Sequence, residues 1–569
     1  MKRLYFLLTG LLTGISAIQA QEPQKNETQL DRTIVVENLY NPDIMNANKI
    51  SLLPTLEEPQ MNKKQIEYAA STKPAGQFEF NPMSHFGSTP QQSYDKNGYL
   101  RVGYGNRGNI DGRLAYRLEW GERDVVNANI NFRGINGTIK LPEIIGETDK
   151  WDTRAYRTQG SIDWTHRFNP FALQVKAEGE NQVYNYMNLT PWIDNAHQHN
   201  AMGSLMATIK SYHNDNPISY TAGTGMLYAK QKYAFGYYDD NYSEPYAETI
   251  IRSHALVTGE VNEHTNIHIA AQMDNIFSNP GGEYNQTNLT ILQMNPYITS
   301  KGVNWEARMG LHVNPLFGNG GTDLSLAPNF YGEYTILPKY KAYLQADGGH
   351  VLNDFRNVNR FDPYAEFPIF KEDKNEIGYY APKHTFHQLD SRLGFKATPI
   401  NELALQLYVG YRITENQLFS TRFTDHNYGD LGRLMQDDAN RFYIGASAQY
   451  AWKDIISTQA SFEWNKWDSD MLEKYSTLTP EASFQWNTTI RLIEDLHVGV
   501  NYQFERYVKD MDGSRFHAKS ELGLTTTYRI LDKLNTYITA NNILNQKYYE
   551  YMLQPAQGFN ILIGAALDF

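Results

Sequence analysis

The chain has 569 residues, of which 40 are tyrosine, and carries a formal net charge of -12 at pH 7. An acidic balance of this size argues against binding to nucleic acid or to an anionic membrane surface. The chain contains no cysteine, which excludes disulfides, thiolate metal sites and a lipid anchor on an N-terminal cysteine.

Residues 1–20 have the pattern of a secretory signal peptide. Lys2 and Arg3 form a charged start, an apolar stretch follows, and the small residue Ala20 precedes Gln21. We therefore expect the chain to be exported and cleaved near residue 20.

Residues 21–97 form a polar leader that is rich in Gln, Asn and Pro. The leader lacks the alternating or Gly-rich pattern of a compact β domain. Within it, residues 32–36, with the sequence RTIVV, combine several β-favouring side chains. A chance cluster in a disordered tail and a short recognition strand both fit this pattern.

Residues 98–569 contain a long series of segments in which apolar and polar residues alternate. In the run 111–121, for example, Leu114 and Leu118 alternate with Arg113 and Arg117. Mean hydropathy is -0.56, and after residue 20 no apolar run approaches the ~20 residues that a membrane-spanning helix needs. A period of two directs one set of side chains to lipid and the other to a polar interior, which is typical of a transmembrane β-barrel.

We count 22 such runs, of which the one at 287–299 alternates poorly. The connections after even-numbered runs are short, as at 122–123, 262–263, 399–401 and 453–454. Those after odd-numbered runs are mostly long, and the longest are expected at 134–157, 180–199, 230–248, 350–384 and 414–440. This asymmetry predicts short periplasmic turns and long extracellular loops, and the even count places both termini in the periplasm.

The last run alternates up to a terminal aromatic residue. Ile563, Leu567 and Phe569 fall on one face, opposite Gly564 and Asp568. By resemblance to other outer-membrane proteins, Phe569 and Leu567 form the signal that the barrel-assembly machinery reads. The predicted fold class is all-β, a transmembrane antiparallel β-barrel of about 22 strands in the lipid of a Gram-negative outer membrane.

The motifs of catalysis are missing from the sequence. It has no G-x-S-x-G, no H-E-x-x-H and no phosphate-binding glycine loop, so we expect neither an enzyme nor a cofactor. His197 and His199, near Asp194, have a spacing that suits two metal ligands on one strand face. A polar external loop tip explains them more simply, and we expect no metal.

One long loop, at 231–248, combines aromatic residues with four acidic ones. Rigid aromatics beside hydrogen-bond acceptors suit binding of a sugar or of a protein surface. An aromatic girdle that packs on its own neighbours is the alternative, and we favour it. The aromatic residues are Tyr233, Phe235, Tyr237, Tyr238, Tyr242 and Tyr246.

The segment before the last run resembles the C-terminus of the TonB-dependent receptors, which carries the pattern N-[LI]-[FL]-N-x-x-Y. QGF stands here in place of the usual PGR. The matching residues are Asn542, Ile543, Leu544, Asn545 and Tyr548, followed by Pro555, Gly558 and Phe569.

This resemblance implies a 22-strand barrel and a short segment that pairs with TonB by strand addition. Residues 32–36 resemble such a TonB box through Thr33, Ile34, Val35 and Val36. Receptors of the family also hold a globular plug, for which the 77 residues from Gln21 to Asn97 are too few. Because a lumen of this width needs filling, we expect the leader, infolded long loops or a partner such as a surface lipoprotein to occlude it.

The expected organisation is a signal peptide at 1–20, a periplasmic segment without a plug at 21–97 and a barrel at 98–569. Two functions from different classes fit it. The first is a receptor-type transport protein for nutrient uptake or passage across the outer membrane. The second is a structural barrel subunit of an envelope complex, occluded by partner proteins.

Overall fold

The computed structural model describes most of the chain from residue 97 onward. The expected signal peptide, the leader and the TonB-box-like residues lie outside the described residues. The described residues are 97–145, 148–187, 197–212, 217–233, 245–279, 287–318, 321–364, 369–373, 376–380, 383–425, 429–509, 513 and 515–569.

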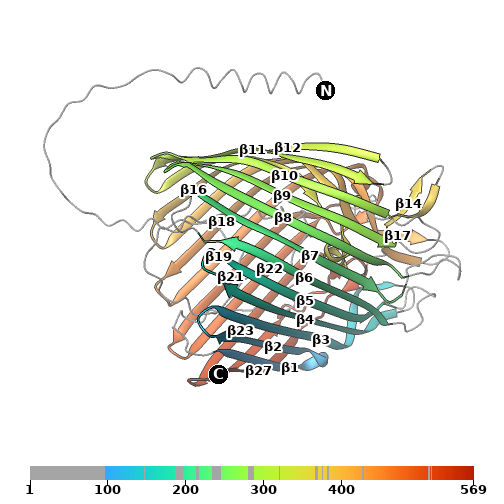
Figure 1. Ribbon diagram of the computed structural model, residues 1–569. Coiled ribbons are helices and arrows are strands. Elements are labelled where there is room, and N and C mark those ends of the chain that lie inside the picture. The colour runs from blue at the N-terminus through green and yellow to red at the C-terminus, as the bar shows by residue number, and fades with distance from the viewer. Residues whose placement is uncertain are drawn as a thin grey trace. The chain divides into compact units, whose positions relative to one another are not determined.

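These residues form one large antiparallel sheet in which each long strand pairs with the next along the chain (Figure 1). The first half of the sheet comprises β1 (Gly98–Gly105), β2 (Ile110–Trp120), β3 (Asp124–Ile145), β4 (Thr148–Arg167), β5 (Phe171–Asn185), β6 (His197–Ser211), β7 (Ile218–Gln231), β8 (Ala247–Asn262), β9 (Thr265–Asn279), β10 (Thr287–Lys301) and β11 (Trp305–Gly318). The second half comprises β12 (Gly321–Leu337), β13 (Tyr340–Val351), β16 (Thr385–Ile400), β17 (Leu403–Asp425), β18 (Gly429–Trp452), β19 (Ile456–Asp468), β21 (Pro480–Ile493), β22 (Leu496–Tyr507), β23 (Lys519–Leu531), β24 (Leu534–Asn541) and β27 (Asn560–Asp568).

The remaining elements are short. Beside β17 lies the two-residue strand β20 (Ser476–Thr477). The others are the 3-10 turn η2 (Asn106–Gly108), the helices α2 (Phe355–Phe361) and α3 (Asp470–Lys474), and the hairpins β14 (Ile369–Asp373) with β15 (Glu376–Tyr380) and β25 (Tyr549–Tyr551) with β26 (Gln554–Pro555).

The sheet closes on itself between its first and last strands. β27 pairs with β24 on one side and with β1 on the other, in a register that runs from Tyr99 opposite Asp568 to Gly105 opposite Leu562. Closure leaves the sheet without an exposed edge, which a membrane-spanning sheet requires. The prediction of a closed antiparallel barrel of 22 strands is confirmed, and the poorly alternating run at 287–299 is strand β10.

The predicted alternation decides which side chains face outward. On β2, Leu114, Leu118 and Trp120 are exposed, whereas Arg117, between Leu114 and Leu118, is half-buried. On β27, Ile563 is 59% exposed and Leu562 beside it is fully buried. The outer surface is therefore an apolar belt that suits lipid, and the inward side chains form a lumen wall.

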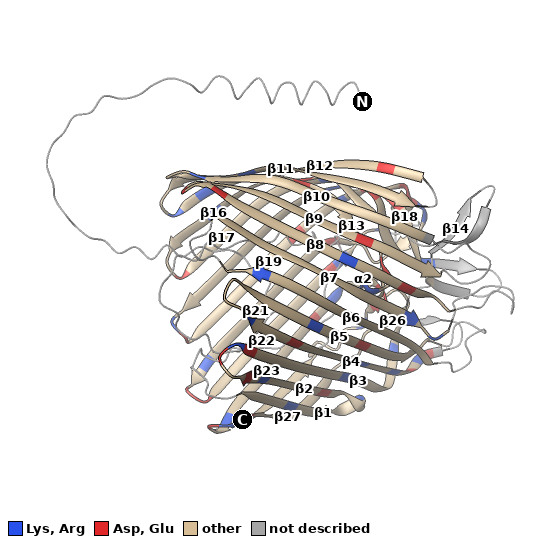
Figure 2. Ribbon diagram, viewed as in Figure 1, with Lys and Arg blue, Asp and Glu red and all other residues tan. Residues whose placement is uncertain are grey.

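Charged residues occur within the strands as well as at their ends (Figure 2). On β17, Tyr411 is exposed and therefore outward, and its neighbour Arg412 is buried. Arg252 on β8 and Asp274 on β9 form an ion pair of 2.6 Å on the inner side of their strands. The lumen wall is accordingly polar over its middle section.

The two ends of the barrel differ in their connections. At one end, the turn end, strands are joined by short turns such as 121–123, 263–264 and 453–455. Asn97 and Phe569 lie at this end as well, since the N–H of Arg117 donates to Asn97 and that of Phe569 donates to Gly98. At the opposite, loop end, the longest connection within the described strands is the one between β13 and β16.

The prediction of long loops is wrong at two places. Residues 134–157 mostly continue β3 and β4, and residues 414–440 mostly continue β17 and β18. Both stretches pair in register almost to their tips, for example Lys140 with Lys150 and Asp425 with Gly429. These strands extend past the apolar belt, and there the pattern inverts. On β3, for example, the exposed residues Thr138 and Lys140 are polar and Ile139 between them is buried, so the apolar-out alternation used to recognise strands is lost.

Candidate functional site

The chain folds into its own lumen after β13. Residues 352–364, which we name the strap, carry the helix α2. Asp354 begins this helix as its N-cap, because its carboxylate accepts a hydrogen bond of 2.7 Å from the N–H of Asn357. The Asn357 side chain donates back to the carbonyl of Leu352 over 2.9 Å, which fixes the angle at which the chain enters the helix.

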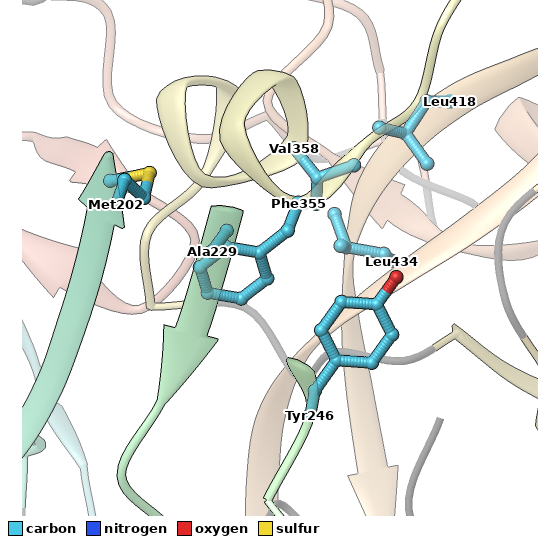
Figure 3. Packing of buried hydrophobic residues seen from close by; sticks show 7 residues of the cluster. All are labelled: Met202, Ala229, Tyr246, Phe355, Val358, Leu418 and Leu434. Atoms are coloured by element: carbon cyan, nitrogen blue, oxygen red, sulfur yellow. The ribbon is translucent and has the colours of Figure 1, made fainter. Parts of the chain in front are cut away.

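Apolar side chains of the strap pack against both sides of the barrel. The ring of Phe355 stacks on that of Tyr246, with 5.6 Å between their centroids. Figure 3 shows Phe355 and Val358 of the helix among side chains from β6, β7, β17 and β18. The strap therefore bridges the lumen, because β9 to β16 separate these two walls. The buried cluster consists of Met202, Ala229, Tyr246, Phe355, Val358, Leu418 and Leu434.

A second apolar contact anchors the start of the strap. Leu352 is buried against inward side chains at the loop ends of β8, β9 and β10. These side chains, Ile250, Ile276 and Ile291, are themselves almost fully buried. The inward face of these strands thus changes from polar to apolar near the loop end, which explains the weak alternation of β10.

Polar contacts hold the helix from the β8 side. The carboxylate of Glu248 accepts hydrogen bonds from the N–H of Phe355, over 3.2 Å, and from the hydroxyl of Tyr246, over 2.8 Å. Arg356 donates to the carbonyl of Gly203 on β6 over 3.2 Å. Tyr246 and Glu248 thus provide both an apolar and a polar contact to the start of the helix.

The buried carboxyl group of Asp354 makes an electrostatic contribution that partly opposes docking of the strap. Burial raises the pKa of Asp354 above the usual range, and the nearby Asp274 carboxylate adds to this rise. The Asn357 N–H and the guanidinium groups of Arg252 and Arg356 act in the other direction. Burial also lowers the pKa of His384, which follows the strap in the same connection, to about 3.

A second infolded segment, residues 542–559 between β24 and β27, contains the pattern N-I-L-N. Asn542 and Asn545 adopt positive φ angles of 45° and 50°, which Asn tolerates better than most residues. The Asn542 amide donates to the carbonyls of Gln546 and Gln557 over 2.9 Å each, and the Asn545 side chain accepts from the N–H of Phe559. The two Asn residues therefore shape this loop.

The hairpin β25–β26 lies within this second segment and reaches toward the opposite wall. Its tip residues, Met552 and Leu553, are buried against Ile139 on β3 and Trp151 on β4. Met552 also lies against Gly432 on β18. The hairpin therefore spans from the wall near the seam to the wall formed by β18.

The strap and the hairpin meet in an aromatic cluster. The rings of Tyr364 and Tyr551 lie 5.7 Å apart, and Tyr364 also packs edge-on against Tyr184 of β5 at 4.7 Å. The hydroxyl of Tyr184 donates to the carbonyl of Pro363. Trp151 and Tyr186 complete the cluster.

The loop end of the described barrel is thus crossed by two segments of the chain itself. Of the three ways of occluding the lumen considered from sequence, infolded loops are present. The leader lies outside the described residues. The sequence predicts the long loop at 350–384 that contains the strap, but not its helix, although the N-cap pattern D-F-R-N at 354–357 signals a helix start.

The expected binding loop is described only at its two ends. Tyr233 is 42% exposed, with the Lys232 ammonium 4.9 Å from its ring centre. Tyr246 is buried and supports the strap. Phe235, Tyr237, Tyr238 and Tyr242 lie outside the described residues.

The expected histidine pair lies on β6 at the loop end. The Nε2 of His199 is hydrogen-bonded to the side chain of Asn181, and Asp194 lies outside the described residues. Within the described ranges, no three His, Asp or Glu side chains are arranged to hold a metal ion. Nor does that part of the chain contain a helix long and apolar enough to cross a membrane.

The chain was compared with protein families, curated proteins and solved structures. No protein-family model matches the chain, and no curated protein does. Among solved structures, it is similar to the FrpB iron transporter of Neisseria meningitidis, with 10% identity, a TM-score of 0.63 and coverage of 84% of this chain and 82% of that one. The chain has the barrel fold of the TonB-dependent receptors.

Two further structures show the same likeness. The copper transporter OprC has 11% identity and a TM-score of 0.62 over 83% of this chain and 82% of its own. The ferric-catecholate import receptor Fiu of E. coli K12 has 11% identity and a TM-score of 0.59 over 84% and 82%. The receptor-type fold predicted from the C-terminal pattern is therefore confirmed, and these neighbours are transporters and receptors.

Proposed function

We propose that this receptor-type barrel is a transport protein of the outer membrane, involved in the uptake or passage of a nutrient. The observation that carries the proposal is a closed barrel with an apolar outer belt and a polar lumen wall, matched over more than four fifths of its length by two metal transporters and an import receptor. Both termini would be periplasmic, after removal of residues 1–20.

Transport through this barrel requires movement of the strap or of the hairpin β25–β26. The strap and the hairpin cross the lumen at the loop end, so a solute passes only when at least one of them is displaced. Coupling to an energy source would explain how a buried segment is displaced, and residues 32–36 of the leader offer a strand for TonB. Thr33, Ile34, Val35 and Val36 are the residues of this proposed box.

Binding of TonB tests the proposal. Purified full-length protein in detergent should retain the C-terminal domain of TonB on a column. Val35→Pro should abolish this retention, because proline lacks the N–H that strand addition needs. Gln29→Pro, outside the box, is the matched control and should bind normally. No binding by the unchanged protein would refute coupling to TonB.

A structural role is the second candidate. The closure of the loop end by the chain's own segments favours it, because a barrel that never opens serves as a membrane anchor for other proteins. In that case the unchanged protein would not bind TonB, and a stoichiometric partner, such as a surface lipoprotein, would co-purify with it from solubilised membranes.

A further inference from the structure

A second polar cluster lies on the lumen wall, formed by β16, β17, β18 and β19. Asp390 on β16, Arg412 on β17 and Arg441 on β18 are register partners in a row across the sheet. Arg392 on β16 and Tyr443 on β18 lie two positions closer to the turn end than this row. Inward side chains in such rows stand in direct lateral contact, as cross-strand neighbours do.

Aromatic rings hold this cluster in place. The ring of Tyr443 lies across Gly410, where an added Cβ would stand only 2.2 Å from the ring. The Tyr443 hydroxyl donates to Asp390 over 2.6 Å, and the guanidinium of Arg441 lies 4.4 Å from the Tyr443 ring centre. The guanidinium of Arg392 is 5.5 Å from the same ring.

The positive charges of the cluster exceed the negative ones. Arg412 donates to Asp390, and Arg441 donates to Glu463 over 3.2 Å. Within the described residues Arg392 forms no ion pair of its own, so three guanidinium groups share the carboxylates of Asp390 and Glu463. Moreover, Arg412 and Arg441 stand directly opposite each other, an arrangement of like charges that is unfavourable unless a negative group lies between them.

Several donors of this cluster have no partner among the residues that the structure describes. Arg412 is 5% exposed and Arg441 is 6% exposed, yet the Nε and Nη1 of Arg412 and the Nε of Arg441 make no hydrogen bond. His387, fully buried, lies 2.9 Å through Nδ1 from the Thr414 hydroxyl, and its Nε2 is unpartnered too. Other guanidinium Nε atoms of the described lumen wall, such as those of Arg113 and Arg308, also have no partner. This cluster differs because its unpartnered donors are adjacent and belong to side chains with excess positive charge, which suits a ligand that supplies acceptors.

We propose that Arg412 and Arg441, with His387, form a binding site for an oxyanion group, a phosphate or a carboxylate, on the lumen wall. Guanidinium groups offer paired donors that match the oxygens of both groups. Because the free donor atoms are covered in this structure, the anion enters from the lumen as the long Arg412 side chain turns aside. The site does not depend on TonB, so this proposal and the proposed function fail independently.

Binding of small anions to the purified full-length protein tests the site. Inorganic phosphate and malonate are titrated separately in a calorimeter. At least one of them should bind saturably at one site, and a difference in affinity would identify the preferred oxyanion. Arg441→Gln should weaken binding about tenfold, since a charge-assisted hydrogen bond of this kind is worth that much. Arg117→Gln, which removes an inward charge paired with Glu119 elsewhere on the barrel, should change the affinity less than about twofold.

A second variant distinguishes loss of the anion site from loss of folding. Arg412→Gln alone would leave the buried Asp390 carboxylate without its ion-pair partner. Asp390→Asn is therefore combined with it, so that both charges of the pair are removed. This double variant should keep the heat-modifiable gel shift of a folded barrel and lose anion binding. Absence of binding of both anions to the unchanged protein, or equal losses in Arg441→Gln and Arg117→Gln, would overturn the assignment.

Discussion

Phe569 closes the barrel through both its backbone and its ring. Its N–H donates to the Gly98 carbonyl over 2.9 Å, and its carbonyl accepts from the Gly98 N–H over 2.7 Å. The ring stacks on Tyr116 at 6.2 Å and lies across Gly98, where any Cβ would approach it to 2.3 Å. The terminal residue therefore forms part of the seam between β27 and β1.

Removal of Phe569 should weaken this seam. We expect the truncated chain to show much less folded, heat-modifiable protein in the outer membrane, because both the seam contacts and the assembly signal are lost. Gel mobility of unheated and heated membrane fractions measures this. Folding at the level of the intact chain would show that the terminal residue contributes neither contact nor signal.

Asp354 makes the docking of the strap dependent on pH. Because its pKa is raised in the docked strap, docking favours the protonated carboxyl. This contribution is fully present below the ordinary value of 3.8 and is lost as the pH rises through the raised value. Above that raised value the ionised carboxylate therefore opposes docking, although it caps the helix.

Asp354→Asn separates these two effects. Asparagine caps a helix about as well as aspartate but carries no charge, so the α2 amides should exchange more slowly than in the unchanged chain at pH 8. They should also lose the part of the pH dependence above pH 3.8 that the Asp354 carboxyl contributes, after correction for intrinsic exchange rates. Asp354→Ala, which loses the cap at a cost of about 1 kcal/mol, should exchange faster. Identical exchange in Asn and Asp forms would refute the electrostatic argument.

At the scale of elements, the strap is a short helix that depends on few apolar contacts. Phe355→Ala removes the ring that stacks on Tyr246 and should cost about 3–5 kcal/mol of docking free energy. Since α2 takes no part in the hydrogen-bond ladder between the barrel strands, we expect local undocking with an intact barrel. Trypsin should then cut after Arg356 and Arg360.

A matched substitution controls for the loss of an aromatic ring. Phe395 on β16 faces outward and packs on Tyr340 at 6.0 Å. Phe395→Ala should leave the strap as resistant to trypsin as it is in the unchanged protein. Equal cleavage of both variants would mean that the barrel as a whole had loosened.

The strands were predictable because lipid and lumen impose opposite requirements on successive residues. The alternation of Leu114 and Leu118 with Arg113 is a local signal, and so is the terminal Phe569. The signal fails where these requirements end, as in β17 and β18 beyond residue 414. There a strand is fixed by its pairing partner, such as Asp425 with Gly429.

The infolded segments were not predictable in the same way. Met552 reaches Gly432, and Phe355 reaches Tyr246, over separations of more than a hundred residues. No periodicity in either segment specifies such a partner. The N-I-L-N pattern marked the second segment only by resemblance, and its physical role, side-chain hydrogen bonds at two positive-φ positions, follows from the structure.

At the scale of the whole molecule, the sheet is closed by its seam and the lumen is crossed by two infolded segments. The seam joins β1 to β27, the hairpin β25–β26 extends from beside that seam, and the strap crosses from β6–β8 to β17–β18. The two segments meet at Tyr364 and Tyr551. Because each segment contacts strands far apart in the ring, their docking also ties opposite walls together.

This arrangement predicts how the protein conducts ions in a planar bilayer. Lumen width alone would give a barrel of this size a very large conductance, but the strap and hairpin obstruct the loop end. We expect low conductance from the full-length protein, and also from a variant that lacks residues 21–97. Replacing residues 353–364 by a Gly-Ser linker in that leaderless variant should raise conductance several-fold, because it removes the strap. Strong conductance from the leaderless protein with its strap intact would show instead that the leader or a partner, and not the strap, seals the lumen.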